Sequence, residues 1–156
     1  MKPINVVIET PKGSYCKYDY DAELKCFKLK KMLPAGMAFP FDFGFIPDTK
    51  GGDGDPLDVM VISEIGTFPG CCISCRIIGV FKIQQTGPDG KTIRNDRFFA
   101  VPEVSQLFKD VKDIDDLPVA IINQLESFFK NYISQEGKQL EVMERLGAAP
   151  ARRMIH

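Results

Sequence analysis

The segment GDGDPLDVMV gathers three carboxylates, Asp53, Asp55 and Asp58, within six positions of the chain. The glycines and the proline among them favour a tight turn that brings the side chains together. Carboxylates that converge on one point repel one another and raise one another's pKa, and a bound divalent cation removes that cost. Because all-oxygen ligands suit magnesium or manganese better than zinc, the segment predicts a site for Mg²⁺ or a similar cation.

Two other interpretations compete with a metal site of this kind. In an EF-hand calcium loop, Asp53, Asp55 and Glu64 would occupy the first, third and twelfth positions. That loop fails at the fifth position, which is Leu57, and at the sixth, where Asp58 replaces the required glycine. An ordinary acidic turn stays open, since Asp and Gly are good turn formers, but such a turn does not require Asp58 on the strand that follows.

A CxxC formed by Cys72 and Cys75 lacks the further ligands that a zinc site needs. The sequence has five cysteines, and its only histidine is the last residue, His156. A free cysteine packs like a small hydrophobic residue. We therefore expect residues 71–75 to belong to a buried strand and to bind no zinc.

Composition and charge narrow the class of protein. The 156 residues are 44% hydrophobic and 26% charged, with a net charge of −1, which suits one folded domain over residues 1–156. Without a basic excess, nucleic acid is not an expected partner. No apolar run reaches membrane-spanning length, and residues 1–13 do not resemble a signal peptide. We expect no membrane partner, and a cytoplasmic protein with reduced cysteines.

Strands are the first of the elements that must position the aspartates. Alternating and β-branched segments predict about five of them, followed by helix. The strand segments are residues 4–8, 15–21, 26–31, 57–62, 73–83 and 97–101. Phenylalanines at 39, 41, 43 and 45 recur with a period of two, which indicates a packed strand or an extended edge.

The C-terminal third predicts helix. Asp116 fits an N-cap and Pro118 fits the first turn, and an apolar stripe then recurs at three- and four-residue spacing up to Tyr132. We expect this helix over about residues 116–134, with Gly137 as its stop, and a shorter helix over 105–111. The tail after Gly147 is expected to be poorly ordered. The fold class is α+β, a compact β-barrel with helices packed outside it.

In the order of its segments, the sequence resembles the soluble family I inorganic pyrophosphatases. Their signature, with three aspartates separated by a small residue, a proline and an apolar residue, is present at residues 53–59. The flanking segments are VVIETP at 6–11, GMAFPFDFGFIPDT at 36–49, PGCCISCRIIGVFK at 69–82 and QLESFFKNY at 124–132. The resemblance therefore spans nearly the whole chain.

The resemblance implies an OB-like five-stranded barrel, Mg²⁺-dependent hydrolysis of pyrophosphate to two phosphates, and a homo-oligomer, often a hexamer in bacterial members. It matches Asp53, Asp55 and Asp58 to metal ligands, and Asp55 also to the catalytic residue that handles the attacking water. Since pyrophosphate is a dense anion, metals that activate water and cations that hold phosphate are both needed.

The resemblance also implies residues for the substrate. Lys17, Lys31 and Tyr132 match contacts to the substrate phosphates, and Glu9 matches a position that supports the site. Asp19, Asn95 and Arg97 are further supporting candidates. Lys31 stands where the family has an arginine, so one bidentate donor is lost while the charge is kept.

The departures from the family pattern share a direction. A second pair of metal-binding aspartates is matched to Gln85 and Asn95, and a family lysine to Arg97. The remaining replacements are Asp19 for glutamate, Phe39 and Phe43 for tyrosines, and Ile133 for lysine. Metal ligands thus become fewer and less anionic, and phosphate donors are lost.

These departures leave alternatives to pyrophosphate hydrolysis. One is a protein of the same fold that holds metal and phosphate with weak or no hydrolysis, and another is hydrolysis of a different phosphoanhydride. Asp89 and Asp96 are candidates for a substitute carboxylate. An OB-fold nucleic-acid binder is disfavoured, because carboxylates would face the phosphates.

Overall fold

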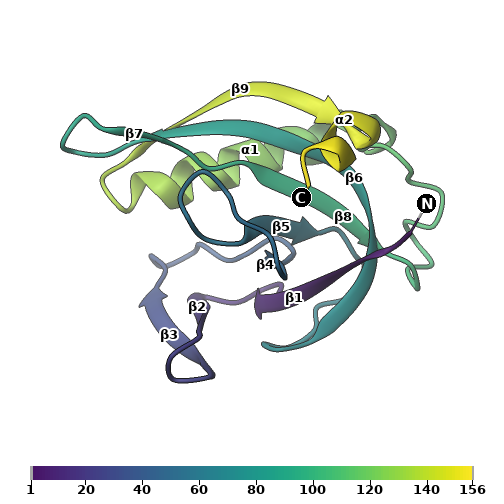
Figure 1. Cartoon of the computed structure of the whole chain (residues 1–156), viewed down its shortest axis with the longest axis horizontal. Coiled ribbons are helices and arrows are strands. Elements are labelled where there is room, and N and C mark those ends of the chain that lie inside the picture. The colour runs from purple at the N-terminus through teal and green to yellow at the C-terminus, as the bar shows by residue number, and fades with distance from the viewer. Residues whose placement is uncertain (1, 156) are drawn as a thin grey trace.

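The computed structural model describes residues 2–155, which form mainly β-strands (Figure 1). The strands are β1 (Ile4–Thr10), β2 (Cys16–Asp21), β3 (Cys26–Met32), β4 (Asp42–Ile46), β5 (Leu57–Val61), β6 (Cys72–Thr86), β7 (Thr92–Arg94), β8 (Arg97–Pro102) and β9 (Gln139–Gly147). The helices are α1 (Val119–Ser134), α2 (Ala148–Arg153) and the 3₁₀ helix η1 (Ile114–Asp116). Every predicted strand segment falls on one of these strands, and the phenylalanine run overlaps β4.

Five strands close into a ring in the order β1, β4, β5, β8, β6, with β6 pairing back to β1. The β5–β8 pair is parallel, and the other pairs of the ring are antiparallel. This confirms the predicted α+β fold with an OB-like five-stranded barrel. The β6 strand is 15 residues long, so it extends beyond the ring and pairs there with β7 and β9. The β2–β3 hairpin forms a separate sheet.

One apolar cluster fills the ring. Side chains alternate between the faces of a strand, and one face of each ring strand contributes to this cluster. Its members include Val6, Ile46, Val59, Ile77 and Phe98, from β1, β4, β5, β6 and β8. The interior of the closed ring is therefore filled by apolar side chains, and a functional site has to lie on its outer surface.

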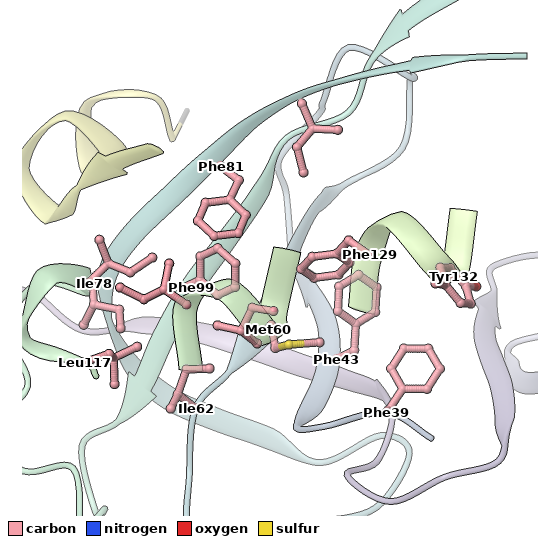
Figure 2. Close-up of a cluster of buried hydrophobic side chains, with 14 of the residues drawn as sticks. Phe39, Phe43, Met60, Ile62, Ile78, Phe81, Phe99, Leu117, Phe129 and Tyr132 are labelled. Atoms are coloured by element: carbon pink, nitrogen blue, oxygen red, sulfur yellow. The ribbon is translucent and has the colours of Figure 1, made fainter. Parts of the chain in front are cut away.

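A second apolar layer lies between the outer face of the ring and α1. Met60 of β5, Phe81 of β6 and Phe99 of β8 meet Phe129 of α1 there (Figure 2). The rings of Phe81 and Phe99 pack edge to face, with centroids 4.6 Å apart. The helix thus packs outside the barrel, as the sequence predicted. Neither α1 nor any other helix within residues 2–155 combines the length and apolar character of a membrane span.

The predicted helix boundaries were partly wrong. The α1 helix begins at Val119 with Pro118 as its N-cap, while Asp116 lies in η1, where it forms a capping box with Asp113. Residues 105–111 form turns and no helix. The physical reason is Glu64, whose carboxylate accepts hydrogen bonds from the backbone amides of Gln106 and Leu107 and so fixes a turn.

The prediction of a poorly ordered tail was also wrong. After β9, which the sequence analysis missed, α2 packs on the barrel with Ala148 and Ala151 buried. Asp113 accepts a hydrogen bond from the amide of Ala148 at 2.8 Å and fixes the start of α2. The expected burial of the cysteine segment holds for Cys75, whereas Cys72 is exposed at the first residue of β6.

Candidate active site

Polar residues replace apolar ones at one end of the layer between the barrel and α1. By strand alternation, Asp58 shares a face of β5 with Met60, and Arg97 shares a face of β8 with Phe99. Asp58 and Arg97 are direct partners in the parallel β5–β8 register. A cleft of about 1200 Å³ opens at this place. One face of β5 and one face of β8 therefore contribute apolar side chains to the packed layer and polar side chains to the site.

Most of the predicted site residues line this one cleft. They are Glu9, Lys17, Asp19, Asp53, Asp55, Asp58, Asn95, Arg97 and Tyr132. Lys31 does not line the cleft, but its neighbour Lys30 does. The sequence analysis missed Lys30, although the alternation along β3 places the two lysines on opposite faces and could have distinguished them.

Lys17 and Lys30 form a basic wall around Asp19. Lys17 is buried and forms an ion pair with Asp19, and Lys30 Nζ lies 3.0 Å from the other carboxylate oxygen of Asp19. Burial alone would raise the pKa of Asp19, but the two lysines outweigh it and hold that pKa below its ordinary value. Asp19 therefore stays ionised and fixes two cations at the cleft.

Lys31 and Tyr132 interact with each other at the C-terminal end of α1. Lys31 Nζ lies 2.5 Å from Glu136 Oε1 and 4.1 Å from the centre of the Tyr132 ring. Burial, with the charge of Glu136 second, raises the pKa of Tyr132, so the phenol remains a neutral donor. Phosphate binding by Lys31 and by Tyr132 stays a prediction.

The carboxylate loop is a tight turn that exposes Asp53 and Asp55. Asp53 Oδ1 accepts a hydrogen bond from the amide of Asp55 at 3.0 Å, and the Gly51 amide donates to the Asp55 carbonyl at 2.7 Å. Gly54 has φ +89°, a backbone conformation that favours glycine. Within residues 2–155, no three carboxylate, histidine or cysteine side chains form a preassembled metal site. The convergence of carboxylates expected from the sequence is therefore absent from this state of the loop.

Asp58 is held by Arg97 at the base of the cleft. Arg97 Nη1 lies 3.1 Å from Asp58 Oδ2 and donates a hydrogen bond to the Asn95 carbonyl at 3.0 Å. The guanidinium lies between two rings, 5.8 Å from the centre of Phe43 and 5.5 Å from that of Phe129. Burial raises the pKa of Asp58 to about 6, against the opposing charges of Arg97 and Lys17. Asp58 thus carries a desolvation cost that a nearby cation would reduce.

Glu9 supports the cleft from β1. Its Oε2 atom accepts a hydrogen bond from the amide of Tyr20 at 2.8 Å, which ties β2 to the barrel beside Lys17. Burial raises the pKa of Glu9 to about 7, and Lys17 only partly offsets this.

A family model described as inorganic pyrophosphatase matches residues 6–156. The chain belongs to the inorganic pyrophosphatase family. An inorganic pyrophosphatase of Synechocystis sp. is 39% identical to it over 140 residues, which make up 90% of this chain and 80% of that protein. One of Halalkalibacterium halodurans is 39% identical over 154 residues, which make up 99% of this chain and 91% of that protein.

Solved structures agree with this assignment. The crystal structure of inorganic pyrophosphatase from Thermus thermophilus has a TM-score of 0.88 to this chain at 30% identity, and the match covers 99% of this chain and 87% of that one. A structure from Anaplasma phagocytophilum, described as an inorganic phosphatase, also has a TM-score of 0.88, at 32% identity and 99% coverage of this chain. The barrel and α1 described above thus belong to the family's fold.

Membership of the pyrophosphatase family implies a divalent metal cofactor, and the donor atoms at the cleft fit one. Asp53, Asp55 and Asp58, which line the cleft, carry only oxygen donors, the type that hard divalent cations bind. Of the two candidate substitutes, Asp89 lines the cleft within the β6–β7 loop. Asp96 accepts hydrogen bonds from the Ile83 amide and from Arg94 Nε and does not line the cleft.

Proposed function

We propose that this protein hydrolyses inorganic pyrophosphate to two phosphates, with Mg²⁺ held by Asp53, Asp55 and Asp58. The observation that carries the proposal is that these three carboxylates share one cleft with the cations of Lys17 and Arg97. An anionic substrate accompanied by divalent cations needs both kinds of group, carboxylates for the metal and cations for the phosphates.

Different residues of the cleft take different roles in the proposed hydrolysis. Lys17 and Lys30, fixed by Asp19, neutralise phosphate charge. Asp55, exposed on the turn, accepts the proton of the attacking water. Tyr132 donates a hydrogen bond to a phosphate oxygen. When bound, Mg²⁺ supplies a Lewis acid that neutralises the developing charge and makes water a better nucleophile.

A second candidate function is the binding of metal and phosphate with weak hydrolysis. It is favoured by the ion pair of Arg97 with Asp58, which occupies one oxygen of a proposed metal ligand. The absence of hydroxyl donors at Phe39 and Phe43 points the same way. Hydrolysis of another phosphoanhydride also fits, since the cleft of about 1200 Å³ is large for pyrophosphate alone.

A phosphate-release assay distinguishes these functions. Pyrophosphate, nucleoside triphosphates and nucleoside diphosphates are each incubated with the protein and Mg²⁺ at millimolar concentration, with and without excess chelator. We expect release from pyrophosphate that the chelator stops. Release from a nucleotide alone would reassign the substrate, and no release at high protein concentration, together with retained binding, would favour the second function.

We also propose that the protein is a cytoplasmic homo-oligomer, with a hexamer as the candidate state. A second groove, away from the cleft, is lined by Ile65 and Val104, which are 64% and 81% exposed. Exposed apolar side chains of this kind mark association surfaces. The five cysteines are unpaired, which suits a reducing compartment. Light scattering on wild type and on Ile65→Asp tests the oligomer, because the charge should produce a smaller species.

A further inference from the structure

The β2–β3 hairpin carries the basic wall of the cleft, although it lies outside the barrel. Its two strands form a sheet of their own, and from it Lys17 of β2 and Lys30 of β3 line the cleft. A two-stranded sheet is at best marginally stable alone in water, so contacts with the rest of the molecule must hold it in place. The accuracy with which these two lysines meet a substrate therefore depends on how the hairpin is attached.

The two strands of the hairpin are attached in different ways. β2 is tied to β1, where the Tyr20 amide donates a hydrogen bond to Glu9 at 2.8 Å. From β3, within residues 2–155, a single side-chain hydrogen bond leaves the hairpin, from Lys31 Nζ to Glu136 Oε1 at 2.5 Å. Glu136 lies just beyond the end of α1. Both side chains are 26% exposed, so water and salt screen this pair less than an ion pair on the open surface.

Lys31 supplies the cation that the end of α1 lacks. The carbonyls at the C-terminal end of a helix carry partial negative charge, which favours a nearby cation and disfavours a carboxylate. The last turn of α1 has no basic residue, and Glu136 adds a negative charge directly after it. Burial alone would raise the pKa of Glu136, but its contacts with Lys31 and Lys138 outweigh burial and hold that pKa below its ordinary value. Lys31 thus faces an ionised carboxylate and a helix end of the same sign.

The same ammonium group lies over the ring of Tyr132, with 4.1 Å between Lys31 Nζ and the ring centre. A cation above an aromatic face is attracted to it. The Tyr132 ring also stacks on Phe128 and meets Phe39 edge to face, with centroids 5.9 and 5.5 Å apart. These three neighbours fix the ring of a residue that lines the cleft, whereas Lys31 itself does not line it.

We propose that Lys31 and Glu136 form a strap that holds β3 against the end of α1 and orients Tyr132, so that Lys31 is a positioning residue and makes no contact with the substrate phosphates. The inference rests on the proposed function, which places the substrate in this cleft and gives Tyr132 a phosphate oxygen to bind. It replaces the role that the family resemblance gives to Lys31. The neighbouring Lys30, which does line the cleft, then carries the phosphate-binding charge of β3.

Hydrogen exchange tests the strap without any substrate. Amide exchange of residues 26–32 is followed by mass spectrometry in wild type, Lys31→Met, Glu136→Gln and the double variant. Each single substitution removes one partner, so these amides should exchange about three- to tenfold faster, the range for a partly shielded ion pair. The double variant should match the single variants within about twofold, because one interaction is lost in all three. Lys28→Met, exposed on the same strand and outside the cleft, is the control and should exchange like wild type.

Pyrophosphate hydrolysis tests whether Lys31 acts through Glu136. Glu136 lines the cleft, so Lys31→Met loosens the hairpin and also leaves this carboxylate less well neutralised beside the substrate. We expect kcat/KM to fall about tenfold in Lys31→Met and about threefold in Glu136→Gln, and the double variant to recover to the level of Glu136→Gln. A direct phosphate ligand would behave differently, since removal of Glu136 would not replace the lost cation.

Tyr132→Phe separates positioning from a purely structural role. In wild type this substitution removes a donor to a charged acceptor, so kcat/KM should fall about tenfold or more. In Lys31→Met the ring is held less well, and the same substitution should cost about threefold or less. In Lys28→Met it should keep its full effect. A strap that only stabilised the fold would leave the effect of Tyr132→Phe the same in every background.

Three results would overturn the proposal. The first is exchange of residues 26–32 that is as slow in Lys31→Met and Glu136→Gln as in wild type. The second is a double variant that hydrolyses as slowly as Lys31→Met, with Glu136→Gln no slower than wild type, which would make Lys31 a phosphate ligand. The third is an effect of Tyr132→Phe that Lys31→Met leaves unchanged. If wild type releases no phosphate, the proposed function fails, and the exchange measurements still decide the strap. Thermal unfolding checks that each variant is folded, and Glu136→Gln decides alone if Lys31→Met is not.

Discussion

The two walls of the cleft are built in opposite ways. The carboxylate loop is a glycine-rich turn whose Asp53 and Asp55 are exposed, and its ligand set is not preassembled. The wall formed by β6 and β8 is rigid, because Gln85 and Arg97 are buried and lie on strands that are paired on both sides. The loop offers anions and the wall offers donors. On the proposed function, the cation itself would gather the carboxylates of the loop, whereas the strands already hold the side chain of Arg97 in place.

Asp58 connects the two walls, since it follows the loop in sequence and forms an ion pair with Arg97. On the proposed function, its carboxylate would have two uses, as an oxygen ligand for a cation and as the partner that orients the guanidinium of Arg97. Substitutions on either wall should separate these uses, because they change either metal dependence or phosphate affinity.

The largest effect is expected from Asp55→Asn on the loop. Asp55 is the proposed acceptor of the proton from water, and general base catalysis is worth about 10²- to 10⁴-fold in rate. We expect kcat for pyrophosphate to fall by that factor with little change in the Mg²⁺ concentration for half-maximal activity. Asp110→Asn, an exposed aspartate outside the cleft, is the control and should leave kcat unchanged. A large shift in Mg²⁺ dependence with unchanged kcat would move Asp55 to a purely ligating role.

A smaller effect, on metal affinity, is expected from Asp53→Asn and Asp58→Asn. Each removes one anionic oxygen ligand, and we expect Mg²⁺ affinity to weaken about ten- to a hundredfold by calorimetry. Only Asp58→Asn also removes the anionic partner of Arg97, but burial already raises the pKa of Asp58 to about 6, so the neutral side chain should not lower the melting temperature at neutral pH in the absence of metal. Equal losses of metal affinity in Asp53→Asn, Asp55→Asn and Asp58→Asn would contradict this division of labour within the loop.

The carboxylate loop was easier to predict from the sequence than the strands that face it. The loop and its aspartates could be recognised because turn residues and carboxylates lie close together in the chain. The five-stranded barrel could be expected from period-two segments and from the resemblance. The place of Gln85 in the cleft could not, because it depends on the pairing of β6 with β7 and β9, and the sequence analysis missed β9. The α2 helix was missed because its buried residues, Ala148 and Ala151, carry little hydrophobic signal.

A moderate gain is expected from Phe43→Tyr, which tests whether the cleft lacks a phosphate donor. Phe43 lines the cleft and packs against Arg97, and a hydroxyl bound to a charged acceptor is worth about 1.5–3 kcal/mol when fully formed. We expect turnover to rise about tenfold, and Asn95→Asp in the same chain to tighten Mg²⁺ binding and to increase the gain further. Phe41→Tyr, outside the cleft, is the control. Unchanged kinetics in both Phe43→Tyr and Asn95→Asp would show that these positions do not take part in phosphate and metal binding.

The smallest effect concerns Glu9, on the strand beside the basic wall, and it appears in stability. Burial raises the pKa of Glu9 from 4.5 to about 7, so the folded state binds this proton more tightly than the unfolded state does. The free energy of unfolding therefore falls as pH rises from about 4.5 to about 7 and is then constant, as far as this group is concerned. Glu9→Gln cannot ionise and keeps an acceptor for the Tyr20 amide.

We therefore expect Glu9→Gln to be more stable than wild type at pH 8 by up to about 3 kcal/mol, or about 6–12 °C in melting temperature, with the difference vanishing near pH 4.5. Thermal unfolding of both proteins in chelator between pH 4.5 and 8 measures it, and Asp58 titrates in both and cancels. Glu141→Gln, exposed on β9, should show no such trend. A stability gain that is the same at every pH, or a loss at pH 8, would mean that Lys17 outweighs burial and that Glu9 is ionised as part of the basic wall.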